Sequence, residues 1–214
     1  MKSYRLKLLS PLFYRTTLDS GASGSTVTSP WIGDIALSYA INRTFCLKEL
    51  KFGYTRYGPK YEELIKLPFI SSVAVPLDDI ERTRVYDIAT SFCSDGYYNF
   101  RAFKSTFNTS MRNWLKRQGI ESGNEFIFSL GFKEDWETPD SFTIRLGNSK
   151  ECLAYCERIE PQGEVTANAY TLSKILGVNV EKMPECKKVE RVLAQYILLH
   201  GMSASEWLSM TGCR

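Results

Sequence analysis

Histidine is nearly absent from this chain of 214 residues, which contains only His200. General acid–base catalysis uses histidine more often than any other side chain, and His200 lies in an apolar run, where we expect a packed histidine with satisfied hydrogen bonds. The nucleophile motif Gly-x-Ser-x-Gly is missing, and no histidine is near a cysteine in the sequence. We therefore expect no catalytic residues.

Long apolar runs are absent as well, since no stretch approaches the roughly 18 consecutive apolar residues of a membrane helix. The N-terminus alternates charged and apolar residues, unlike a secretory signal. Six cysteines at irregular spacing are then typical of reduced thiols in a soluble, cytoplasmic protein. Cys152 and Cys156 lack a second cysteine pair or a nearby histidine, so we expect no metal site.

A phosphate-binding loop is missing too. Residues 20–29 contain Gly21 and Gly24, but no lysine followed by serine or threonine stands at the required distance. We expect a connector here and no cofactor. The net charge of +3 indicates little about partners, so a nucleic-acid surface would have to arise from the local distribution of charge.

Hydrophobic alternation is present in several segments and predicts strands. We expect them at residues 4–9, 70–75, 85–92, 125–132, 142–146 and 152–159, with a turn at 147–148 and a hairpin or loop at 51–60. A helix should follow Ser29 as its cap and Pro30 in its first turn, because Trp31, Ile35 and Tyr39 recur at four-residue spacing.

The C-terminal part is harder to interpret. Residues 167–176 favour a helix that ends at Gly177, and residues 189–200 fit either an amphipathic helix or a buried strand. Ser203, followed by Glu206, forms a capping box for a short helix over 203–210. The order of elements predicts an α+β fold with mixed or antiparallel pairing. We expect a single domain over 1–214, with 165–214 as a C-terminal extension.

The segment from Tyr97 to Arg117 has an unusual composition. It contains five bases, six aromatic residues and no acid; the bases are Arg101, Lys104, Arg112, Lys116 and Arg117. Bases neutralise phosphates, and exposed rings stack unpaired bases. An amphipathic element with buried rings and solvated bases is the alternative, but such faces usually mix both signs of charge. The composition favours contact with nucleic acid.

Two weaker basic patches lie elsewhere. One combines Lys51, Arg56, Tyr57 and Lys60 within the segment 51–60, and the other combines Arg145 and Lys150 on either side of the Gly147 turn. A base at the tip of a hairpin is well placed to contact a phosphate. We therefore include Tyr57, Lys60, Arg145 and Lys150 among the candidate RNA-binding residues.

Three motifs, in this order, resemble those of CRISPR-associated RAMP proteins. SPWIGDIALSYAIN (29–42) resembles the helix after the family's N-terminal strand, SGNEFIFSLG (122–131) its Gly-x-Glu-Phe strand, and FTIRLGNSK (142–150) its Ile-Arg-Leu-Gly-Lys hairpin. The chain is most similar to the small backbone subunit of type I-D Cascade. Asn148 stands where the family often has a base, and residues beyond Glu164 match poorly.

The resemblance implies a modified ferredoxin-like, RRM-related fold with an antiparallel sheet, extra hairpins and short C-terminal helices. It also implies a non-catalytic subunit of an antiviral ribonucleoprotein that caps the 5′ handle of crRNA. Implied partners are a backbone RAMP protein, the large subunit and target DNA near the PAM. Two alternatives stay open: a RAMP-type endoribonuclease that cuts precursor crRNA, using His200 with Tyr57 or a lysine, and a protein-interaction module without nucleic acid.

Overall fold

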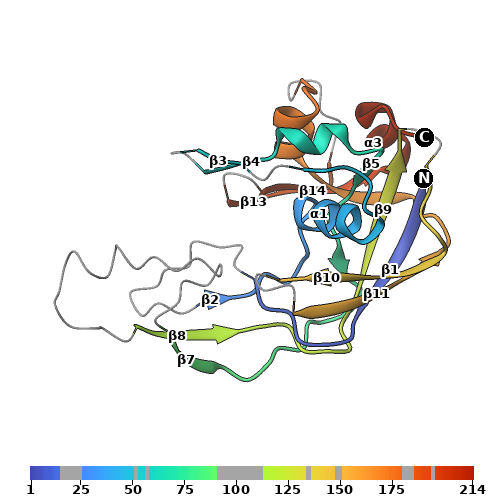
Figure 1. Ribbon diagram of the computed structural model, residues 1–214. Coiled ribbons are helices and arrows are strands. Elements are labelled where there is room, and N and C mark those ends of the chain that lie inside the picture. The colour runs from blue at the N-terminus through green and yellow to red at the C-terminus, as the bar shows by residue number, and fades with distance from the viewer. Residues whose placement is uncertain are drawn as a thin grey trace.

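A computed structural model gives the fold of the chain. It describes residues 1–14, 26–50, 53–55, 58–90, 113–133, 136–147, 151–179, 186–193 and 196–214. Figure 1 shows a main sheet with one long helix beside it, a C-terminal group of elements, and a small sheet that projects at the lower left. Within the described part of the chain, no helix is long and apolar enough to span a membrane.

The main sheet is antiparallel and has the strand order β10-β11-β1-β9-β5. Its strands are β1 (Lys2–Leu8), β5 (Phe69–Ser71), β9 (Glu125–Phe132), β10 (Ser141–Leu146) and β11 (Cys152–Ile159), and β6 (Val75–Pro76) also pairs with β9. Alternate side chains are buried, as Tyr4, Leu6 and Leu8 are on β1. The strands predicted at 4–9, 125–132, 142–146 and 152–159 are confirmed.

The strand order is ferredoxin-like. β1 and β5 both lie antiparallel to β9, so they are parallel to each other, and the helix α1 (Asp34–Phe45) lies in the connection between them. β11 flanks β1 on its other side, and β10 extends the sheet beyond it. No helix is present in the described residues between β9 and β11, where the ferredoxin-like pattern places its second helix. The expected α+β, modified ferredoxin-like fold is therefore confirmed.

Helix α1 begins later than the sequence predicts. Its N-cap is Gly33, and not Ser29. Ile32 exchanges two backbone hydrogen bonds with Ala74, at 2.9 Å each, which keeps the preceding residues extended. The tertiary pairing thus overrides the local cap signal at Ser29 and Pro30. From Asp34 onward the helix buries Ile35, Leu37 and Ile41 in the core.

The segment 70–75 was predicted as one strand but forms two short ones. β5 ends at Ser71, and β6 begins at Val75. The residues between them bridge elsewhere, because Val73 pairs with Thr166 and Ala74 with Ile32. The pairing of β3 (Gly53–Thr55) with β4 (Gly58–Lys60) agrees with the prediction for 51–60, and the 3-10 helix η1 (Glu62–Lys66) follows it.

The C-terminal region folds against the main sheet. It contains β12 (Glu164–Asn168), the π-helix η2 (Thr171–Ile175), β13 (Lys188–Leu193), β14 (Tyr196–Ser203) and α3 (Ala204–Thr211), with strand order β12-β14-β13. A second apolar cluster joins Ile70 of β5 to Trp207 of α3 and Leu172 of η2. That residues 165–214 extend a single domain stays a prediction.

Two C-terminal predictions need correction, and one is confirmed. Residues 189–193 and 196–200 belong to the strands β13 and β14, so the helical interpretation is wrong. The helix expected over 167–176 begins only at Ala169, because Ala167 and Asn168 pair with β14. Ser203 caps α3 as predicted, and its hydroxyl accepts a hydrogen bond from the Glu206 amide.

Candidate nucleic-acid interface

The end of the basic, aromatic segment forms a strand. β8 (Asn113–Gln118) pairs with β7 (Tyr86–Thr90), and β2 (Thr26–Val27) joins β8 from the other side. This three-stranded sheet is the projection at the lower left of Figure 1, and we call it the arm sheet. β7 confirms the strand predicted over 85–92 in the residues that are described.

Two of the five predicted bases of this segment lie in described residues, and both are on the arm sheet. Arg117 stands opposite Tyr86 in the ladder, and Lys116 stands opposite Asp87. Arg101, Lys104 and Arg112 lie outside the described residues, so their role stays a prediction.

Hydrogen bonds fix the root of the arm sheet to the body. The Gln118 side chain donates to the Thr83 carbonyl at 3.1 Å, and the Thr83 hydroxyl accepts from the Gly119 amide at 3.0 Å. The Arg82 guanidinium donates to the Thr28 carbonyl at 2.6 Å. These bonds hold the arm strands in a defined position, which a binding surface requires.

Basic and aromatic side chains meet at this root. The Arg84 guanidinium lies 5.0 Å from the centre of the Tyr86 ring, and the Phe13 ring meets Tyr86 edge to face at 5.7 Å. Because directly opposed residues of a ladder share a face, Arg117 lies on the same face as Tyr86. We call Phe13, Arg84, Tyr86 and Arg117 the arm-base cluster.

The charge of the arm-base cluster is not neutralised within the described part of the chain. Arg84 is exposed and Arg117 half-exposed, and no described carboxylate forms an ion pair with either. Guanidinium groups bind phosphates in a bidentate manner, and a tyrosine ring stacks a base. The cluster can therefore hold a nucleotide by its phosphate and its base.

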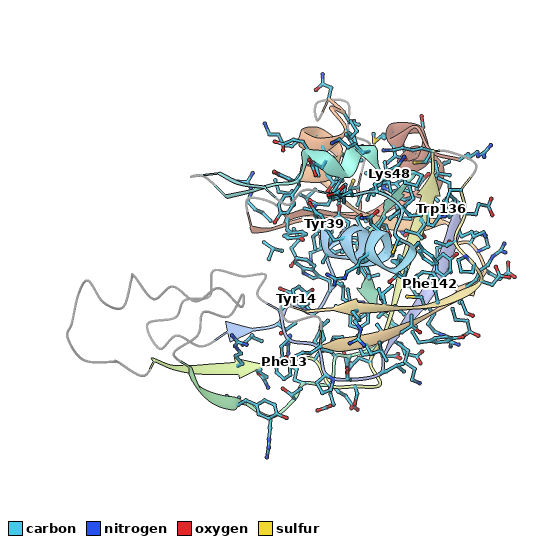
Figure 2. The ribbon with its side chains drawn as sticks, in the orientation of Figure 1. Phe13, Tyr14, Tyr39, Lys48, Trp136 and Phe142 are labelled. Carbon is cyan, nitrogen blue, oxygen red and sulfur yellow. The ribbon has the colours of Figure 1, made fainter. Side chains whose placement is uncertain are left out.

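Phe13 comes from a segment that is anchored in the core. Leu12 exchanges backbone hydrogen bonds with Ile120, and the Tyr14 hydroxyl donates to the Trp31 carbonyl. Burial raises the pKa of Tyr14 well above its ordinary value. Figure 2 shows Phe13 beside the arm sheet and Tyr14 nearer to α1. Tyr14 therefore holds Phe13 at the arm.

The second predicted patch lies at the end of β10. Arg145 is exposed and stands opposite Leu153, and Lys150 lies outside the described residues. Gly147 has a φ of +86°, which favours glycine, and a Cβ there would lie 3.0 Å from the Phe13 carbonyl oxygen. The β10 end therefore lies against the segment that carries Phe13.

The third patch is separate from the arm. Lys60 ends β4, opposite Gly53, while Tyr57 lies outside the described residues. Figure 1 shows β3 and β4 at the upper left, well away from β7 and β8. The structure does not bring Lys60 and Arg117 together.

Sequence reasoning missed three of the four residues of the arm-base cluster. Arg84 and Tyr86 precede the acid-free segment, and Phe13 is distant from it in the chain. Only the pairing of β7 with β8, and of Leu12 with Ile120, brings them to Arg117. One signal in the sequence could have indicated that Arg84 and Tyr86 lie together. They are two residues apart, and residues at that spacing lie on one side of an extended chain.

His200 has partners for both ring nitrogens. Nε2 lies 3.2 Å from a Glu190 carboxylate oxygen, and Nδ1 lies 3.4 Å from the Thr166 hydroxyl. The ring is half-buried on β14, and not within the core as expected. Burial raises the pKa of Cys156 and of Cys152, the latter to about 11. Within the described residues, no three His, Cys, Asp or Glu side chains are grouped so that they could hold a metal.

Comparison with solved structures finds six matching chains. One of them belongs to the cryo-EM structure of the Type III-B Cmr-beta bound to cognate target RNA and AMPPnP, state 1. It has a TM-score of 0.48 and 10% sequence identity, and the match covers 94% of this chain and 84% of that chain. No curated protein matches this chain. The fold assignment above rests on the strand order.

A family model matches nearly the whole sequence. The family is described as type I-D CRISPR-associated protein Cas5/Csc1, and its model covers residues 1–200. This match confirms the resemblance that the three ordered motifs indicate, and it extends past Glu164, beyond which the resemblance by motif is poor. The chain belongs to the Cas5/Csc1 family of type I-D CRISPR-associated proteins.

Proposed function

We propose that this chain is a non-catalytic subunit of a CRISPR surveillance complex that holds the 5′ handle of crRNA and docks beside a backbone RAMP protein and the large subunit. Family membership makes it a component of a type I-D CRISPR complex. The observation that supports the RNA-binding role is the arm-base cluster, where Arg84 lies 5.0 Å from the half-exposed Tyr86 ring and Arg117 stands opposite Tyr86 in the ladder.

The cluster favours a single-stranded ligand. Stacking on Tyr86 requires an unpaired base, and alanine substitution of such a ring costs about 1–3 kcal/mol. The guanidiniums of Arg84 and Arg117 would bind the flanking phosphates and release counterions. The other bases of the segment would extend this surface along the RNA; they are Arg101, Lys104, Arg112 and Lys116.

The endoribonuclease alternative depends on His200 as its general base. His200 lies on β14, where its two ring nitrogens face Glu190 and Thr166. The arm-base cluster comes instead from β7, β8 and the segment of Phe13, so the candidate base and the proposed RNA site lie on different elements. If His200→Ala abolished cleavage of precursor crRNA by the purified complex, the endoribonuclease alternative would replace this proposal.

Sequencing the RNA that copurifies with the tagged chain tests the identity of the ligand. The chain is expressed together with its CRISPR array and the other subunits, in the cytoplasm where we propose that it acts. We expect discrete small RNAs that share one 5′ end. A complex with a protein-only absorbance spectrum would refute the proposal and favour the protein-interaction module. Crosslinking of the chain to target DNA near the PAM would add that partner.

Charge reversal tests the cluster itself. The variant Arg84→Glu/Arg117→Glu should bind the handle RNA at least about ten-fold more weakly, and the slope of log K against log salt should fall by roughly 0.7 for each lost phosphate contact. Lys174→Glu/Arg191→Glu, which reverses two exposed bases of the C-terminal region, is the matched control. Equal affinities of the two variants would remove the arm-base cluster from the site.

A further inference from the structure

One face of the main sheet is only partly covered. On β1 the side chains of Tyr4, Leu6 and Leu8 are buried with α1, while the alternate residues Arg5, Lys7 and Leu9 are exposed. The C-terminal region covers the start of this second face, where the Gln162 amide donates to the Ser3 hydroxyl at 3.0 Å. The remainder, which we call the open face, comprises Arg5, Lys7, Leu9, Leu77, Glu125, Ile127, Thr143, Arg145, Leu153, Tyr155 and Glu157.

Exposed apolar side chains concentrate on the open face. Of the seven large apolar residues that are exposed in the described chain, it carries three, with exposed fractions of 50% for Leu9, 43% for Leu77 and 37% for Tyr155. Backbone pairing places Tyr155, Lys7, Glu125 and Leu77 in one row across neighbouring strands. A contiguous patch with an aromatic residue and aliphatic neighbours is typical of a protein interface.

The bases of the open face are mostly neutralised, unlike those of the arm-base cluster. The Arg5 guanidinium lies 2.8 Å from Glu157 and 3.7 Å from Glu125, and the Lys7 ammonium lies 3.1 Å from Glu125. A phosphate backbone on this face would have to displace these carboxylates from the bases. The open face is therefore a poor surface for nucleic acid, although Tyr155 is an exposed ring.

Two hollows with acidic linings border the open face. One, of about 470 Å³, lies beside Tyr155 and includes Asp140, Glu157 and Glu160, together with Arg158, which pairs with Asp140 at 3.0 Å. The other, of about 300 Å³, is lined by Asp78, Asp79, Glu81 and Glu125. Within the described residues, Asp78, Asp79, Glu81 and Glu160 form no ion pair. The rim is thus negative although the whole chain carries a net charge of +3.

We infer that the open face docks a neighbouring protein subunit whose contact surface is apolar at its centre and rich in lysine and arginine at its rim. The apolar centre would cover Leu9, Leu77 and Tyr155, and the basic rim would meet the two acidic hollows. The inference builds on the proposed membership of a multisubunit complex. It assigns RNA to the basic arm and a protein neighbour to the sheet face that has acidic borders.

Variants of exposed residues test this inference in the assembled complex. Tyr155→Ala/Leu9→Ser removes apolar contact, and Asp79→Lys/Glu160→Lys reverses the rim. Each should reduce the retention of at least one protein neighbour about ten-fold or more, which is the effect of losing a central contact or several rim charges. Loss through the rim variant should be largest at low salt. Val189→Ala and Glu49→Lys, which change residues exposed elsewhere, should leave the complex intact.

Two quantities are measured. The first, in the complex, is the amount of each copurifying subunit and of RNA relative to the tagged chain. The second, for the purified chain, is the affinity for handle RNA. Unchanged subunit ratios in both open-face variants would overturn the inference. The inference would also be overturned if the open-face variants kept their neighbours but the purified chain bound RNA more weakly. Loss of self-association alone would overturn it too, because the face would then belong to a contact with a second copy of the chain. A further outcome separates the two proposals. If neither the assembled complex nor the purified chain binds RNA, but the open-face variants still lose a neighbour, the proposed RNA-binding function fails and this inference stands.

Discussion

Replacing Asp34 by asparagine should stabilise the protein at neutral pH. Asp34 is fully buried in the first turn of α1, where its carboxylate accepts a hydrogen bond from the Asn168 side chain at 2.9 Å and another from the Thr171 hydroxyl. Burial raises the pKa of Asp34 from its ordinary value of 3.8 to about 6, although these hydrogen bonds lower it. The carboxylate is thus ionised at pH 7.5 at a cost to folding.

The size of that cost follows from the pKa difference. The folded chain binds the Asp34 proton more tightly than the unfolded chain does, so protonation of Asp34 stabilises the fold. This stabilisation is complete below pH 3.8 and is lost as the pH rises through about 6. At 1.36 kcal/mol per pKa unit, the full cost at pH 7.5 is about 3 kcal/mol. Asparagine is neutral but has one fewer acceptor, and losing a hydrogen bond costs about 1 kcal/mol. We therefore expect a net gain of about 2 kcal/mol.

Urea denaturation at pH 7.5 and pH 5 measures the effect. The variant's gain in the free energy of unfolding over wild type should be smaller at pH 5 than at pH 7.5, by roughly half of the full ionisation cost. The reason is that much of the wild-type carboxyl is protonated in the folded chain at pH 5. Asp34→Ala is the control, because it is neutral as well but leaves the Asn168 and Thr171 donors without their acceptor, so it should be about 1–3 kcal/mol less stable than Asp34→Asn. A variant Asp34→Asn that is less stable than wild type at both pH values would refute the reasoning and show that the ionised carboxylate is required.

Two further predictions concern packing and thiol reactivity. Gly33→Ala should lower the free energy of unfolding by about 1–3 kcal/mol, because the new Cβ would lie 2.5 Å from the Tyr196 ring. Gly163→Ala is the control and should have little effect on the melting temperature, because no atom lies within 4 Å of its new Cβ. Iodoacetamide at pH 8 should label the exposed Cys46 in the folded chain but spare Cys156, whose thiol pKa is raised by burial; equal labelling, measured by mass spectrometry, would show that β11 opens readily.

The central strands could be predicted because their signal is local. β1 and β10 alternate apolar and polar residues, and a strand with one buried face requires that pattern wherever it pairs. The cap of α3 was equally local, since Ser203 and Glu206 bond within one turn. The start of α1 was missed, and residues 189–200 stayed open between a helix and a strand, because backbone pairing with other segments decided both.

The sequence by itself determined that this protein carries a basic, aromatic segment free of acids, and that the chain belongs to the Cas5/Csc1 family. Only the tertiary structure decided which side chains act together. Arg117 was predicted from composition, but Phe13, Arg84 and Tyr86 join it through strand pairing. The acids that border the open face are likewise scattered along the chain. Charge and ring stacking act through space over a few ångströms, so linear order cannot specify a surface built from separate strands.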